Sequence, residues 1–244
     1  MPTSISIELV PRNSETLLAH AEIAAQYLQI THLNIPDLTH RTGFTPLRSV
    51  EAIALVKASF GARFTYVTHV RAGDNVFQPD ICGDDIALVV TGDKPFPSLP
   101  FARDVSAVER IRNLSQRMTV MAGLDPYRSS TVRELEYVAM KCRAGAQGFF
   151  TQPFFSLPSL RYWNSLLPNG LNVFYGISPV TTEASLKYWK EKNRAVFPIN
   201  FDPTLKGQVE LARRIIRLAV AKERSVYLMP IRTPLAEYLK QVFV

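Results

Sequence analysis

Cysteine is scarce in this sequence: Cys82 and Cys142 are the only two among 244 residues. Two cysteines are too few for a disulfide framework or a four-cysteine zinc site, and a reducing cytoplasm is the expected compartment. Long hydrophobic runs are missing too, because none approaches the roughly 18 to 20 apolar residues that cross a bilayer. The start, Met-Pro-Thr-Ser, has neither the basic end nor the apolar segment of a signal peptide. We therefore expect no membrane partner.

Several chemical signatures are absent as well. The four histidines do not stand at metal-ligand spacing, so no metal site is expected. The sequence contains no Walker loop, no G-x-S-x-G elbow and no paired-histidine motif. The turn after the first apolar run, 11–14, reads Pro-Arg-Asn-Ser and has no glycine. A doubly wound sheet usually carries a glycine-rich turn at that place, so this architecture is disfavoured.

Positive charge is in excess, with 28 lysines and arginines against 21 aspartates and glutamates and a net charge of +7. Such a balance suits nucleic acid, anionic lipid or an anionic small molecule. The basic residues gather only modestly, at Arg213, Arg214, Arg217, Lys222 and Arg224, on an amphipathic helical pattern. A solvated outer helix face explains this group better than a nucleic-acid stripe, and no nucleic-acid motif is present.

The chain alternates short apolar runs with amphipathic stretches. Eight runs rich in Ile, Val, Phe and Tyr read as strands: Ser4–Val10, Thr31–Ile35, Phe64–Thr68, Ile86–Thr91, Met118–Ala122, Gly148–Thr151, Leu171–Gly176 and Val226–Met229. Helical periods lie between most of them, and Asn13 or Ser14 is suited to cap the first. Eight strand–helix units in about 250 residues predict an α/β fold, a single (β/α)8 TIM barrel that covers residues 1–244 as one domain.

One helix carries an explicit start signal. Thr131 is followed three residues later by Glu134, which is the spacing of a capping box. The helix that it opens is expected to bury one face. That face is predicted to contain Val132, Leu135, Val138, Ala139 and Cys142.

In a barrel of this kind the active site lies where the strands end, and Glu8 is the most unusual residue there. Alternation places Ser6, Glu8 and Val10 on one face of the first strand, and the opposite face is apolar. Glu8 is therefore expected to point into the barrel mouth, where desolvation suits a carboxyl group to proton donation. A pairing of Glu8 with a barrel arginine, such as Arg71 or Arg232, explains the same placement equally well.

Four segments at strand ends resemble one enzyme family. Segment 141–155 has a Lys-x-x-x-Gly-Ala run followed by Thr-Gln and aromatic residues, and 91–95 reads Thr-Gly-Asp-Lys-Pro. Segment 175–179 reads Tyr-Gly-Ile-Ser-Pro, and 7–12 reads Ile-Glu-Leu-Val-Pro-Arg. Together they resemble methylenetetrahydrofolate reductase over nearly the whole chain. The likeness implies an oxidoreductase of folate one-carbon metabolism. It would reduce 5,10-methylenetetrahydrofolate to 5-methyltetrahydrofolate, or run in reverse, with NADH or NADPH through bound FAD.

The resemblance assigns roles to individual positions. Glu8 matches the general acid, and Asp93 an aspartate that lies near flavin and pterin. Gln152, Trp189 and Arg232 match residues that bind the folate. Thr68, Gly92, Asp93 and Lys141 fall on the cofactor side, where Lys141 is suited to pair with phosphate.

The sequence also departs from the family pattern. Tyr66 stands where the third strand usually has histidine, Arg12 replaces a proline, and the loop 124–128 lacks the usual Tyr-Pro-Glu-x-His pattern. These departures keep two alternatives open: direct hydride transfer from nicotinamide to folate without flavin, and a non-catalytic subunit that binds folate or flavin. A homo-oligomer is compatible with all three readings.

Overall fold

The computed structural model describes residues 3–38, 47–72, 85–91 and 107–243. Within them, eight parallel strands close into a barrel in the order in which they follow along the chain. The strands are β1 (Ile5–Glu8), β2 (Ile30–Ile35), β3 (Thr65–Arg71), β4 (Ile86–Val90), β5 (Thr119–Leu124), β6 (Gly148–Pro153), β7 (Asn172–Ile177) and β8 (Ser225–Leu228). Each overlaps one of the predicted runs, so the predicted TIM barrel is confirmed.

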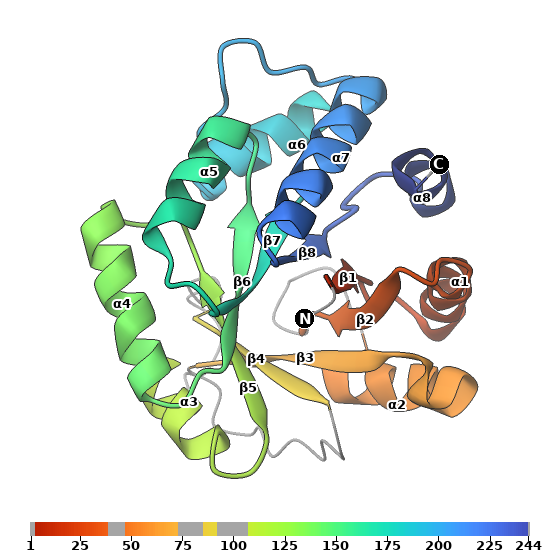
Figure 1. Cartoon of the computed structure of the whole chain (residues 1–244). Coiled ribbons are helices and arrows are strands. Elements are labelled where there is room, and N and C mark those ends of the chain that lie inside the picture. Colours follow the sequence, from red (N-terminus) through yellow and green to blue (C-terminus); the bar gives the residue numbers. More distant parts are fainter. Residues whose placement is uncertain (1–2, 39–46, 73–84, 92–106, 244) are drawn as a thin grey trace.

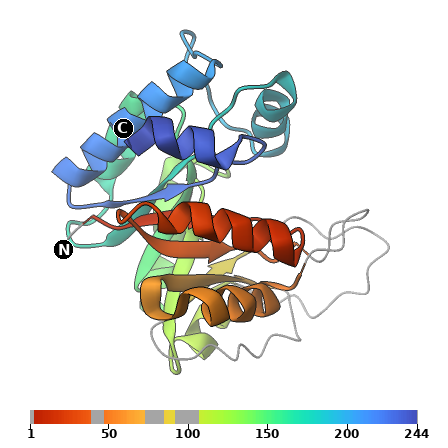
Figure 2. The same ribbon diagram turned by 90° about the vertical axis from the view of Figure 1, so that its right-hand side faces the viewer.

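The helices surround the barrel, as Figure 1 shows and as the side view in Figure 2 shows for the elements near both termini. They are α1 (Ser14–Ala25), α2 (Ser49–Phe60), α3 (Ala107–Leu114), α4 (Thr131–Arg143), α5 (Leu157–Leu166), α6 (Glu183–Lys187), α7 (Leu205–Ala221) and α8 (Leu235–Phe243). A short 3-10 turn, Gly61–Arg63, and a π-helical turn, Tyr188–Lys192, continue α2 and α6. Asn13 caps α1, as predicted, by accepting a hydrogen bond from the Thr16 amide.

The prediction for α4 was wrong in two respects. Ser130, not Thr131, is the N-cap, because its hydroxyl accepts from the Arg133 amide. The buried residues of α4 are Glu134, Val138 and Lys141, whereas Val132 and Cys142 are exposed. Periodicity alone predicts apolar side chains on the inner face. In the structure two charged residues, Glu134 and Lys141, lie on that face because residues on and after β5 provide polar partners for both.

Helix α5 has no counterpart among the predicted helices. Its sequence starts with Leu-Pro, and Pro158 lies in the first turn, where the missing N–H of proline costs nothing. Ser156 caps it by accepting a bond from the Ser159 amide. The pair Ser156 and Pro158 was the available signal for a helix start.

The core has two layers. The outer layer lies between strands and helices, and Ile7 and Leu9 belong to it. The inner layer fills the barrel, and its apolar part consists of Val67, Ile86, Leu88, Met121, Phe150, Phe174, Tyr227 and Met229. The predicted alternation of β1 is therefore confirmed: Ile7 packs outward, while Ser6 and Glu8 point inward.

Candidate active site

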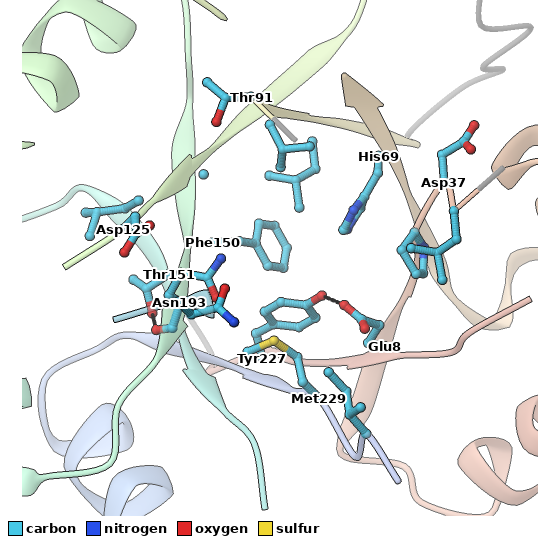
Figure 3. Close-up of a pocket in the computed structure, with 18 of the residues that line it drawn as sticks. Glu8, Asp37, His69, Thr91, Asp125, Phe150, Thr151, Asn193, Tyr227 and Met229 are labelled. Atoms are coloured by element: carbon cyan, nitrogen blue, oxygen red, sulfur yellow. Dashed lines mark hydrogen bonds between the residues drawn. The ribbon is translucent and has the colours of Figure 1, made fainter. Parts of the chain in front are cut away.

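A cavity of about 900 Å³ opens at the carboxyl ends of the strands. Its walls include Glu8 from β1, His69 from β3, Phe150 from β6 and Tyr227 from β8, which Figure 3 shows directed toward a common space. The volume lies within the range of ordinary ligand pockets. The carboxyl ends of TIM-barrel strands are where active sites of this fold lie, so the cavity is the candidate site.

Glu8 is joined to Tyr227, a residue that sequence reasoning did not select. The Tyr227 hydroxyl donates a hydrogen bond to Glu8 Oε2. Burial, and next the negative charge of Glu8, raise the pKa of Tyr227 well above its ordinary value. Tyr227 therefore stays protonated and acts as a fixed donor to the carboxyl group. The alternation of β8 was the available signal, because Ser225 and Tyr227 share its inner face.

His69 faces the same space from β3 (Figure 3). Burial lowers the pKa of His69 to about 4, and the nearby Asp37 opposes this only in part. The imidazole is thus neutral near pH 7 and offers one donor and one acceptor. Its Nε2 atom is buried and has no hydrogen-bond partner among the described residues. A neutral ring with a free nitrogen at a cavity wall is suited to bind a polar ligand.

A charged cluster supports the cavity beside β5. The buried Glu134 carboxylate accepts bonds from the Asp125 amide, at 3.1 Å, and from the Arg128 guanidinium. Lys141 Nζ donates to the Gly123 carbonyl oxygen at 2.5 Å and lies 3.9 Å from the Tyr137 ring centroid. Burial lowers the pKa of Lys141 to about 8 despite the Glu134 charge. Burial also raises the pKa of Asp125.

The mouth on the β6–β8 side rests on aromatic side chains. Trp189 is 3% exposed, and its ring centroid lies 5.7 Å from that of Phe155. Ile231 packs on the same cluster, and Arg232 follows it. Arg194 and Arg232 have φ angles of 57° and 59°, and both line the cavity. This left-handed conformation is rare outside glycine and concentrates at functional sites.

The structure brings five of the predicted site residues to this cavity: Glu8, Lys141, Gln152, Trp189 and Arg232. It does not bring Thr68, whose side chain lies behind the barrel wall with its hydroxyl 3.3 Å from Ser49 Oγ. Gly92 and Asp93 lie outside the described residues. The partners expected for Glu8 were Arg71 and Arg232; both line the same cavity, and Tyr227 is a partner that the sequence did not indicate.

In the described segments, no group of three or more His, Cys, Asp and Glu side chains could hold a metal ion. None of their helices combines the length and apolar character required to cross a membrane.

Two of the four residues that the resemblance assigns to the cofactor make other contacts in the described structure. Thr68 faces away from the cavity, and the Lys141 ammonium is occupied by the Gly123 carbonyl and the Tyr137 ring rather than directed at a phosphate position. The other two residues assigned to the cofactor, Gly92 and Asp93, lie outside the described part of the chain. FAD therefore stays a prediction, and no chemical step is derived through it below.

Comparisons with known proteins support the fold. No family model and no curated protein matches the chain. Among solved structures, a protein of B. cereus described as uncharacterized matches with a TM-score of 0.55 and 11% identity, over 99% of this chain and 65% of that chain.

Two enzymes match in the same way. Dihydropteroate synthase from Xanthomonas albilineans, in complex with 7,8-dihydropteroate, matches with a TM-score of 0.53 and 15% identity, over 99% of this chain and 91% of that chain. A truncated 3-deoxy-D-arabino-heptulosonate 7-phosphate synthase from Thermotoga maritima matches with a TM-score of 0.54 and 10% identity, over 98% of this chain and 84% of that chain. At such low identities these likenesses show the TIM-barrel fold alone.

Proposed function

We propose that this protein transfers a hydride between a nicotinamide cofactor and the one-carbon unit of methylenetetrahydrofolate. The observation that carries the proposal is Glu8, hydrogen-bonded to Tyr227 at the wall of the mouth cavity. The resemblance of segments 7–12 and 141–155 to methylenetetrahydrofolate reductase supplies the reaction. The position of Gln152 and Trp189 at the same cavity supports it.

The reaction needs one proton and one hydride. One carbon–nitrogen bond of the five-membered ring breaks, its nitrogen takes up a proton, and the methylene carbon takes up a hydride. The dihydronicotinamide ring supplies the hydride and leaves oxidised. The protein therefore has to provide an acid at a ring nitrogen and hold two flat rings against each other.

Glu8 is the proton donor in this proposal. A carboxylic acid donates through one oxygen while the other accepts, so Tyr227 can hold one oxygen of Glu8 as the other faces the ligand. The Tyr227 bond also stabilises the carboxylate that remains after the proton has left. Gln152 offers a donor and an acceptor to the pterin edge, and the aromatic cluster around Trp189 supplies an apolar surface for a flat ring.

The test is turnover combined with the visible spectrum. The purified protein is mixed without oxygen with NADH or NADPH and then with methylenetetrahydrofolate. Oxidation of the nicotinamide by a colourless protein would support direct transfer. Flavin bands that bleach with the nicotinamide and return with folate would assign the transfer to FAD. Absence of turnover, with or without added FAD, would contradict the proposal and favour a non-catalytic binding subunit.

Glu8→Gln is the matched variant. It keeps the size and a hydrogen-bond acceptor but cannot supply the proton, so folate reduction should fall by roughly 10²- to 10⁴-fold, the usual contribution of a general acid. Glu210→Gln, which changes an exposed carboxylate on α7, serves as the control. Full turnover by the Glu8 variant would remove Glu8 from the mechanism.

A further inference from the structure

The inner faces of three neighbouring strands carry hydroxyl, carboxyl, imidazole and amide groups. Alternation directs Ser225 and Tyr227 of β8, Ser6 and Glu8 of β1, and His32 and Asn34 of β2 into the barrel. These strands are adjacent in register: Ser6 pairs with both Tyr227 and His32, and Glu8 pairs with Asn34. We call these six residues the polar seam. The inner cluster formed mainly by the other strands is apolar.

Two members of the seam have unsatisfied polar atoms. Ser6 and Asn34 are both 0% exposed. Ser6 Oγ and Asn34 Oδ1 and Nδ2 have no hydrogen-bond partner among the described residues. A buried polar group without a partner destabilises the folded state. Internal water is the usual remedy, because one buried water makes about three bonds to such groups.

The seam extends from the cavity toward the amino-terminal ends of the strands. Its upper end is Glu8 at the cavity. Its lower end is the half-buried His32, whose Nδ1 lies 2.8 Å from the Thr31 hydroxyl. Burial lowers the pKa of His32 to about 4, so the ring is neutral near pH 7 and can both donate and accept. On β8, Ser225 Oγ accepts from the Ser4 amide at 3.2 Å.

We propose that ordered water binds between Ser6 and Asn34 and passes protons to Glu8 from the amino-terminal end of the barrel. The role of Glu8 as an acid rests on the proposed function. After Glu8 has given up its proton, the carboxylate takes one from the adjacent water, that water takes one from the next group, and solvent near His32 supplies the last. A ligand in the mouth closes the shorter way to solvent, so an inner path lets Glu8 regain its proton while the cavity is filled.

The ionisable groups around Glu8 are poor proton donors near pH 7, so water is the proposed source of the proton. Tyr227 on β8 holds its proton too tightly to be a source. His69 on β3 and His32 on β2 are neutral near pH 7. Among the described residues, the charged side chains that line the cavity also include Arg12, Asp37, Arg71 and Arg232.

High-resolution crystal structures test the water site. The wild type should show ordered water bonded to Asn34 and Ser6, and Asn34→Leu and Ser6→Val should lose it. Both variants exchange an unsatisfied polar group for an apolar one, so they should fold. Tyr238→Phe is the control, because it removes another buried, unpartnered hydroxyl on α8, away from the seam. A dry seam in the wild type would overturn the inference.

Kinetics test the proton supply. Asn34→Leu should lower kcat by roughly tenfold, with a larger solvent isotope effect and little change in KM, since a proton relay is interrupted. Asn34→Ser, which keeps a polar group, should restore part of the rate. Unchanged kcat in Asn34→Leu would overturn the relay. A wild type without turnover would overturn the proposed function and the relay together, while crystallography would still decide the water site.

Discussion

Glu8 shows how one residue acquires a chemical role from its neighbours. The side chain is half-buried at a cavity wall, and the Tyr227 hydroxyl fixes one of its oxygens. An acid held in this way is positioned before the ligand arrives, so no free energy is spent on ordering it during the reaction. The same bond affects the proton affinity of Glu8, because a donor stabilises the carboxylate form.

Tyr227→Phe isolates this bond. The variant removes the donated hydrogen bond and disfavours the carboxylate form of Glu8. Glu8 must be protonated to act as an acid. Without the Tyr227 hydroxyl, Glu8 keeps its proton to higher pH. The alkaline limb of the kcat profile should therefore move to higher pH by roughly one to two units, since a charge-assisted hydrogen bond contributes about 1.5–3 kcal/mol. A pH–rate profile from pH 5 to 10 measures it, and an unmoved limb would contradict this role.

At the scale of elements, α4 and β5 are joined by buried charges. Glu134 fixes the chain after β5 through the Asp125 amide and Arg128, and Lys141 reaches the Gly123 carbonyl within β5. These contacts explain why the sequence pattern failed for α4. An amphipathic pattern identifies apolar residues that suit a buried face, but it cannot detect a charged residue whose partners come from another element.

Lys141 makes stability depend on pH. Its pKa is lowered from 10.5 to about 8 in the folded protein. Between these values the unfolded chain binds more protons at this site, so the free energy of unfolding rises with pH. Relative to Lys141→Met, the wild type should gain about 2 kcal/mol between pH 8 and pH 10.

Urea unfolding at several pH values measures this slope. Lys222→Met, which changes an exposed lysine at the end of α7, is the control and should follow the wild type. Parallel pH dependence in the wild type and Lys141→Met would show that the lysine is not desolvated in the folded state.

At the scale of the molecule, the mouth of the barrel carries positive charge. Of the described residues that line the cavity, seven are arginine or lysine, and three are aspartate or glutamate. The excess of basic residues that gives the chain its net charge of +7 is thus found at the candidate site as well as on the outer face of α7. Like charges that converge on a concave site attract anionic ligands, which include both a dinucleotide and the glutamate tail of a folate.

Salt should therefore weaken substrate binding. Raising the salt concentration from about 0.05 M to about 0.5 M shortens the screening length severalfold, so KM should rise by a factor of roughly 3 to 10 with little change in kcat. Arg194→Ala at the mouth should flatten this dependence, whereas Arg217→Ala on the outer face of α7 should not. A KM that does not change with salt concentration would contradict electrostatic attraction of the substrate to the mouth.

The sequence by itself determined the local structure and the order of elements. Hydrophobic periods identified all eight strands because a buried strand or helix face repeats every two or about 3.6 residues. The same alternation correctly turned Glu8 inward. It also missed α5, whose start signal was a capping serine followed by a proline in the first turn rather than a clear apolar period.

Only the tertiary structure decided which residues meet. Tyr227 and Glu8 are 219 positions apart and touch because the barrel closes β8 against β1. The polar seam depends on the same closure, since each strand contributes two inward residues that look ordinary alone. The partner of Lys141 also depends on how α4 packs against β5. Contacts between distant segments follow from strand register and barrel closure, and neither is written in any local pattern of residues.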